Sequence, residues 1–158
     1  MSIKNRQLLV TLSPERLRNF SRYVKEVIDS DISEFTDEKL KKLYYDFELG
    51  ELASDLCNKV NTEYVEFIEN MKKQSAEYII EAAYEIVWKD NIAQFIETEP
   101  PTLSKKQYVA LLSAKNALKE IYDEWISNGE LHTYDDIAVL LEDTAGKILV
   151  SLSRELEE

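Results

Sequence analysis

The stretch that most constrains the fold is residues 78–88, Tyr-Ile-Ile-Glu-Ala-Ala-Tyr-Glu-Ile-Val-Trp, in which nine of eleven residues are apolar or aromatic. Its two acids, Glu81 and Glu85, are four residues apart, so they share one narrow stripe of a helix that Lys89 extends. A helix that is apolar around the rest of its circumference must be covered on most sides. We therefore predict a central buried helix over residues 76–89, with this stripe as its one exposed edge.

The low content of glycine and proline indicates the fold class. The 158 residues include only three Gly and three Pro, whereas hairpins and nucleotide-binding loops depend on glycine at their turns. A chain of this length is one domain by its size. We predict an all-α fold, a compact single-domain bundle of five to seven helices over residues 1–158.

Cysteine usage and hydropathy limit the class of protein further. The single Cys57 excludes an internal disulfide framework and a multi-cysteine metal site. The apolar run at residues 8–10 is too short for a signal peptide. No stretch approaches the roughly 20 apolar residues of a membrane span. We expect no membrane contact and a cytoplasmic location.

Charge is divided unevenly along the chain. The net charge is −12, but residues 1–25 carry six basic residues and one acid, so the remaining 133 residues carry −17. We distinguish a basic N-terminal helical segment, residues 1–35, from an acidic helical body, residues 36–158. An acidic body suits a basic protein partner and repels nucleic acid.

Helix-start signals divide the first part of the chain. Ser13, followed by proline and glutamate, predicts a helix over residues 14–29. Thr36 begins the next helix, and Gly50 either ends it or lies inside a longer helix that reaches residue 72. Ser75 caps the 76–89 helix. Lys89 and the two polar residues after it predict a kink or a new short helix over residues 91–97, and prolines 100 and 101 end helical structure.

The last third of the chain repeats this pattern. Ser104 caps a helix that is interrupted at residues 115–116, and residues 128–129 (Asn-Gly) form its stop. Thr133 caps the last helix. Apolar residues recur there at alternating spacings of three and four, and this seam either packs inside the bundle or forms a homodimer through residues 134–152. The seam consists of Tyr134, Ile137 or Ala138, Leu141, Ala145, Ile148 and Leu152.

No set of residues indicates catalysis. A di-metal site in a helical bundle uses a Glu-x-x-His element from each of two helices, and His132 is the only histidine. Cys57 lies among apolar residues, so we expect it to be packed rather than paired with a base. Glu85 pairs with Lys89 at the i,i+4 spacing in the simplest interpretation. We predict no catalytic, metal or cofactor residues and no enzyme activity.

A family resemblance covers residues 52–147. The runs 63–68 (Glu-Tyr-Val-Glu-Phe-Ile), 82–85 (Ala-Ala-Tyr-Glu) and 89–92 (Lys-Asp-Asn-Ile), with Leu118, Tyr122 and Trp125, carry it. They resemble an uncharacterised helical family of clostridia and their relatives, domain of unknown function 3848. The resemblance implies a helical protein often encoded on mobile elements. The family supplies no catalytic residues to carry over.

Surface residues are the remaining candidates. Arg18, Arg22 and Lys25 form a basic patch that contacts nucleic acid, an acidic partner or the acidic body itself. Tyr23, Tyr45 and Tyr84 are candidates for exposure. For Tyr45 the reason is that the adjacent tyrosines 44 and 45 cannot both face inward. The lysines around residues 104–128 lie among acids, so we do not assign them to DNA binding. The partner-binding candidates are Arg18, Arg22, Lys25, Tyr45, Glu81 and Glu85.

These observations favour a non-catalytic interaction or regulatory protein. Its acidic surface would bind a basic protein, such as a nucleic-acid enzyme. The alternative is a nucleic-acid-binding accessory protein that uses the basic N-terminal helix. A third hypothesis is an enzyme with Glu81 and Glu85 as its acid pair, which requires both carboxylates to open into a pocket.

Overall fold

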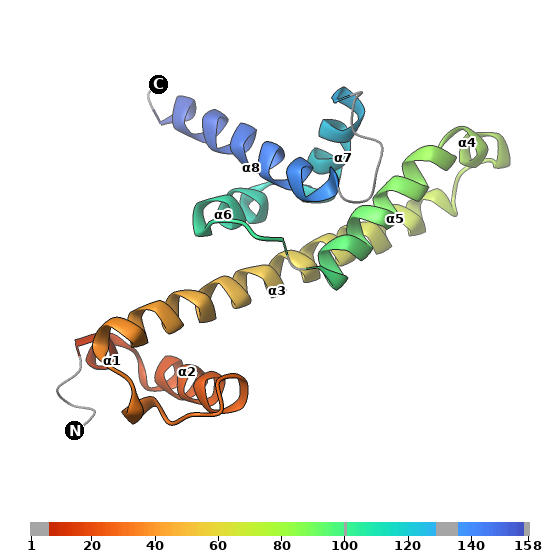
Figure 1. Cartoon of the computed structure of the whole chain (residues 1–158). Helices are drawn as coiled ribbons and strands as arrows, with labels where there is room; N and C mark the ends of the chain where they lie inside the picture. The colour runs from red at the N-terminus through yellow and green to blue at the C-terminus, as the bar shows by residue number, and fades with distance from the viewer. Residues whose placement is uncertain (1–6, 100, 129–135, 157–158) are drawn as a thin grey trace. The chain divides into compact units, whose positions relative to one another are not determined.

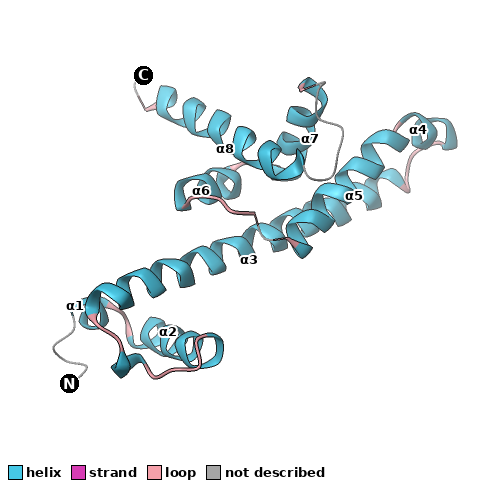
Figure 2. Ribbon diagram, in the orientation of Figure 1, coloured by secondary structure: helices cyan, strands magenta, loops and turns pink. Residues whose placement is uncertain are grey.

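The computed structural model describes residues 7–99, 101–128 and 136–156, which form eight α-helices and one 3-10 turn, with no strand among them (Figures 1 and 2). The predicted all-α class is therefore confirmed. The helix count exceeds the predicted five to seven, because the short helices α1 (Gln7–Thr11) and α4 (Ala76–Glu81) form separately.

Contacts divide the chain into two units, Met1–Glu51 and Leu52–Glu158. The boundary lies inside helix α3 (Asp37–Met71), so Gly50 does not end that helix. A Cβ atom at Gly50 would meet no atom within 4 Å, so close packing does not require a glycine at this position. The structural boundary also differs from the charge boundary at residues 35 and 36, because the first turns of α3 contribute Leu40 and Phe47 to the core of the first unit. A single domain stays a prediction.

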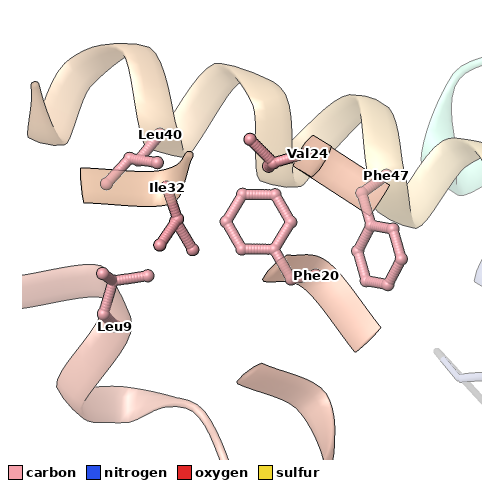
Figure 3. Close-up of a cluster of buried hydrophobic side chains, with 6 residues drawn as sticks. All are labelled: Leu9, Phe20, Val24, Ile32, Leu40 and Phe47. Carbon is pink, nitrogen blue, oxygen red and sulfur yellow. The ribbon is translucent and has the colours of Figure 1, made fainter. Parts of the chain in front are cut away.

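The first unit has a small core of its own. Helix α1, helix α2 (Pro14–Val27), the 3-10 turn η2 (Ile32–Glu34) and the start of α3 each point apolar side chains into it (Figure 3). Phe20 lies at its centre, with ring centroids 5.2 Å from Tyr44 and 5.6 Å from Phe47. Such edge-on and tilted aromatic pairs add about 0.5–1.5 kcal/mol each beyond area burial. The core consists of Leu9, Phe20, Val24, Ile32, Leu40 and Phe47.

The second unit contains the larger core. Helix α8 (Asp136–Glu155) packs on α6 (Lys105–Ser113) and α7 (Ala117–Ser127), and α7 packs on α5 (Ala83–Thr98). Ser75 and Ser104 cap α4 and α6 as predicted, and Asn116 caps α7 after the predicted interruption. Helix α5 ends at Thr98, before the prolines. The predicted cap Thr133 lies outside the described residues.

The 78–88 stretch is not a central buried helix, and this prediction is wrong. The helix breaks at Ala82, whose N–H donates to carbonyl oxygens of both Tyr78 and Ile80. Helix α4 buries no residue, and the buried face of α5 begins only at Lys89. The reason is that neighbouring helices cover the second half of α5 more fully, where Ile92 and Ile96 are buried, whereas Tyr84 and Val87 in the first half stay exposed.

The predicted break after Trp88 is also wrong, because α5 continues through residues 89–91 to Thr98. Two of the three polar residues there have partners that helical geometry permits. Lys89 pairs with Glu85, and Asp90 accepts a hydrogen bond from Gln94 at 2.7 Å. Polar residues in succession therefore do not interrupt a helix whose neighbours satisfy them.

Candidate functional site

The basic patch lies on helix α2, where Ser13 caps the first turn and Pro14 occupies its first position. Arg18, Arg22 and Lys25 are all exposed and recur at spacings of four and three, so they share one face. Glu15 and Glu26 are exposed on the same helix and lower its net positive charge. The basic side chains are therefore exposed among acids, and their contact with a partner stays a prediction.

Arg16 is turned toward α3 instead. Its Nε donates to the Tyr44 hydroxyl at 2.9 Å, and its guanidinium pairs with Glu51 and, at 3.8 Å, with Glu48. The hydrogen bond to Tyr44 raises the pKa of Arg16, with smaller contributions from Glu51. The guanidinium also lies 4.9 Å from the ring centroid of Phe47. Arg16 therefore holds α2 to α3 and is not part of the patch.

The three tyrosine candidates have different surroundings. Tyr45 on α3 is 44% exposed, while its neighbour Tyr44 packs against Phe20, as the adjacency predicted. Tyr23 is half-buried beside Phe47, and burial raises its pKa. Tyr84 is 52% exposed. Tyr45 and Tyr84 therefore present aromatic surface to solvent.

The acid pair is split between two helices. Glu81 ends α4 and Glu85 lies in the first turn of α5, so the break at Ala82 removes the continuous stripe. Glu85 Oε1 lies 2.7 Å from Lys89 Nζ, which confirms the predicted i,i+4 pair. Glu81 is exposed, and it lines neither the groove beside the end of α8 nor the one around Asn58 and Thr62.

Lys89 does not lie on an exposed edge, and that prediction is wrong. Its side chain is only 8% exposed, and Nζ lies 4.0 Å from the ring centroid of Phe67 and 5.5 Å from that of Tyr122. The ring quadrupoles and the Glu85 carboxylate compensate the loss of water around the ammonium group. Lys89 therefore joins α3, α5 and α7 within the second unit.

Glu63 was not identified from the sequence. It is 8% exposed, and its Oε2 accepts a hydrogen bond from the backbone N–H of Leu118 at 2.8 Å, at the start of α7. Its Oε1 lies 2.9 Å from Lys59 Nζ. One signal could have found it, because Glu63 occupies a core position of the Leu56, Val60 and Phe67 stripe at spacings of three and four. A carboxylate on an apolar stripe requires a specific buried partner.

An aromatic cluster joins α5 and α7. The rings of Trp88 and Trp125 have centroids 3.9 Å apart, and Tyr84 stacks obliquely on Trp88 at 6.1 Å. The buried Trp125 donates its Nε1–H to the Tyr84 hydroxyl at 3.0 Å. This bond satisfies a buried donor and fixes the orientation of the exposed Tyr84 ring.

The predicted seam of α8 is used inside the second unit over most of its length. Ile137, Leu141 and Ala145 are buried, whereas Leu152 is 39% exposed. Tyr134 lies outside the described residues. A groove of about 290 Å³ runs beside the end of the seam, with the Glu124–Lys147 ion pair in its wall. A homodimer through residues 134–152 stays a prediction.

Cys57 shows no activation as a nucleophile. Cys57 is half-buried, and burial raises the pKa of its thiol, with a further increase from the charge of Glu97. A raised pKa opposes formation of the thiolate, which is the nucleophilic form. His132 lies outside the described residues.

Comparisons with known proteins give no relatives. No family model matches the chain, and no match was found among curated proteins or solved structures. Within the described part of the chain, no group of three potential metal ligands occurs. No described helix combines the length and apolar composition needed to cross a membrane.

Proposed function

We propose that this chain is a non-catalytic interaction protein that binds a basic protein partner through the acidic surface of its second unit. The observation that carries the proposal is the charge of residues 52–158. They contain 21 acidic and ten basic residues, a net charge of −11, whereas residues 1–51 carry −1. Most of the negative charge thus belongs to one unit, where it produces a field that attracts a cationic surface.

Exposure of the acids supports this proposal. Glu77, Glu81, Glu97, Glu142 and Asp143 are exposed, and no described ion pair includes any of them. Charges that are not neutralised within the chain remain available for long-range attraction. A nucleic-acid enzyme is a partner of fitting chemistry, because its binding groove is basic. The resemblance to a family carried on mobile elements agrees with such a partner.

Salt dependence of binding to a defined cationic probe tests the proposal. Labelled polylysine of about 20 residues should bind at low salt and lose most of its affinity as salt approaches the physiological range, where the Debye length falls to about 8 Å. Polyglutamate of equal length is the control and should not bind. Equal binding of the two polymers, or binding of polylysine that salt does not weaken, would refute the proposal.

The exposed face of α2 supports a second candidate, binding of nucleic acid. Arg18, Arg22 and Lys25 lie on one face, although Glu15 and Glu26 accompany them. Replacing all three basic residues with Glu should abolish retardation of duplex DNA in a gel at low salt. This second function would be excluded if the variant still retards the DNA, or if the wild-type protein does not retard it.

A further inference from the structure

Helices α4 and α5 leave a cluster of large apolar side chains exposed. Ile80, Tyr84 and Val87 are 74%, 52% and 56% exposed, and their spacings of four and three are those of residues on one helical face. Figure 1 shows the two helices that carry them, α4 and α5, following one another. The apolar composition of this stretch predicts that other residues cover it, yet the described residues leave these three side chains exposed. Contiguous exposed apolar surface rimmed by polar groups is typical of an interaction site.

The cluster is pre-organised as well as exposed. The Trp125 indole donates to the Tyr84 hydroxyl, and Trp88 supports the Tyr84 ring. An aromatic ring fixed in this way loses little conformational freedom when a partner covers it. Tyrosines of this kind are common energetic centres of interfaces. Tyr84 is thus suited to anchor a partner, with Ile80 and Val87 as neighbouring apolar contacts.

The charges around the cluster decide its occupant. Residues 76–88 contain Glu77, Glu81 and Glu85 and no basic residue; Glu85 is paired with Lys89, whereas Glu77 and Glu81 are exposed. A second copy of the chain would bring these carboxylates against their own equivalents, and like charges across an interface are unfavourable. A partner surface with apolar residues and a rim of lysine or arginine satisfies both the apolar cluster and the acids.

We propose that this surface, the Tyr84 face of α4 and α5, docks an amphipathic basic helix of the partner protein. Apolar side chains of that helix cover Ile80, Tyr84 and Val87, while its basic residues approach Glu77 and Glu81. This is helix-to-helix recognition through apolar anchors at helical spacing. The inference rests on the proposed function, because it specifies where and how the basic partner binds.

The probe is a fluorescein-labelled 18-residue peptide of leucine and lysine, with leucine on one helical face. Fluorescence anisotropy with the full chain measures its affinity. A scrambled peptide of the same composition keeps the charge and loses the apolar face, so its affinity should be at least tenfold weaker. Equal affinity for the two peptides would overturn the docking site.

Neutral substitutions isolate the apolar contribution. Ile80→Gln with Val87→Gln should weaken binding of the amphipathic peptide by roughly tenfold or more, since burying each aliphatic side chain contributes substantially to affinity. Val109→Gln on α6 is the matched control, because Val109 is 51% exposed, and it should change affinity less than about twofold. Equal effects of the double variant and the control would overturn the site.

Charge reversal separates failure of the site from failure of the proposed function. Glu77→Lys with Glu81→Lys should weaken binding more than Glu142→Lys with Asp143→Lys on α8. If both charge variants weaken binding equally and the apolar variant has no effect, the acidic surface acts without this site. If the wild type binds neither peptide nor polylysine, the proposed function fails as well. Sedimentation that shows a dimer disrupted by Ile80→Gln would assign the face to a second copy instead.

Discussion

Replacing Glu63 with alanine should destabilise the second unit strongly. The substitution removes the acceptor of the buried Leu118 N–H and the carboxylate at the positive end of the α7 dipole. A hydrogen bond to a charged group contributes about 1.5–3 kcal/mol. A favourable charge at a helix terminus contributes about 0.3–1 kcal/mol. The expected loss in free energy of unfolding is therefore about 2–4 kcal/mol.

Tryptophan fluorescence during urea and thermal unfolding measures this loss. The only two tryptophans, Trp88 and Trp125, both lie in residues 52–158, so the signal reports the second unit. For a chain of this size each kcal/mol shifts the midpoint by about 2–4 °C. Glu63→Ala should thus lower the midpoint by roughly 4–16 °C.

Two further variants control the interpretation. Glu63→Gln keeps an oxygen acceptor for Leu118 N–H but loses the charge, so it should cost about 1 kcal/mol. Glu66→Ala removes an exposed acid from the same helix and should change stability by less than about 0.5 kcal/mol. If Glu63→Ala and Glu66→Ala are indistinguishable, the buried cap does not stabilise α7 and the reasoning is refuted.

Three other predictions concern buried polar groups. Lys89→Met should cost less than about 1.5 kcal/mol in urea unfolding, because Met fills the same apolar space; Lys89→Ala leaves a cavity and should cost about 3 kcal/mol. Alkylation of Cys57 by iodoacetamide at pH 8 should be slower than alkylation of free cysteine, because burial raises its pKa, and unfolding should abolish the difference. Burial and the hydrogen bond to Asp90 raise the pKa of Tyr64 to about 12, above the unfolded value of 10.0. The folded state therefore holds that proton more tightly, and the stabilisation is complete below pH 10 and is lost as pH rises toward 12; Tyr64→Phe should remove this step from an alkaline unfolding series.

Local signals predicted the helix boundaries well. Ser13, Ser75 and Ser104 each accept a hydrogen bond from a backbone N–H three residues later, and each begins a helix where predicted. The interruption at residues 115–116 was predicted from the break in the apolar stripe there, and in the structure Asn116 caps α7. A cap depends on atoms within a few residues, so sequence alone contains the necessary information.

The candidate surfaces were only partly predictable. The exposure of Arg18, Arg22, Lys25 and Tyr45 followed from helical periodicity. The exposure of the Tyr84 face of α4 and α5 could not be predicted in this way, because its apolar composition is equally typical of a core helix. Periodicity shows that a face is apolar but not which distant element covers it.

The sequence by itself determined the all-helical class, the starts of the helices that Ser13, Ser75 and Ser104 cap, and the concentration of negative charge beyond residue 25. Tertiary structure decided whether Glu63, Lys89 and the residues of the 78–88 stretch are buried or exposed. Glu63 is buried because α7 offers a backbone donor, and Lys89 is buried because Phe67 and Tyr122 enclose it. Within the 78–88 stretch, Trp88 packs on Trp125, whereas Ile80, Tyr84 and Val87 are exposed because no described helix covers them. Caps arise from neighbours in sequence, whereas burial depends on residues that folding brings together from far along the chain.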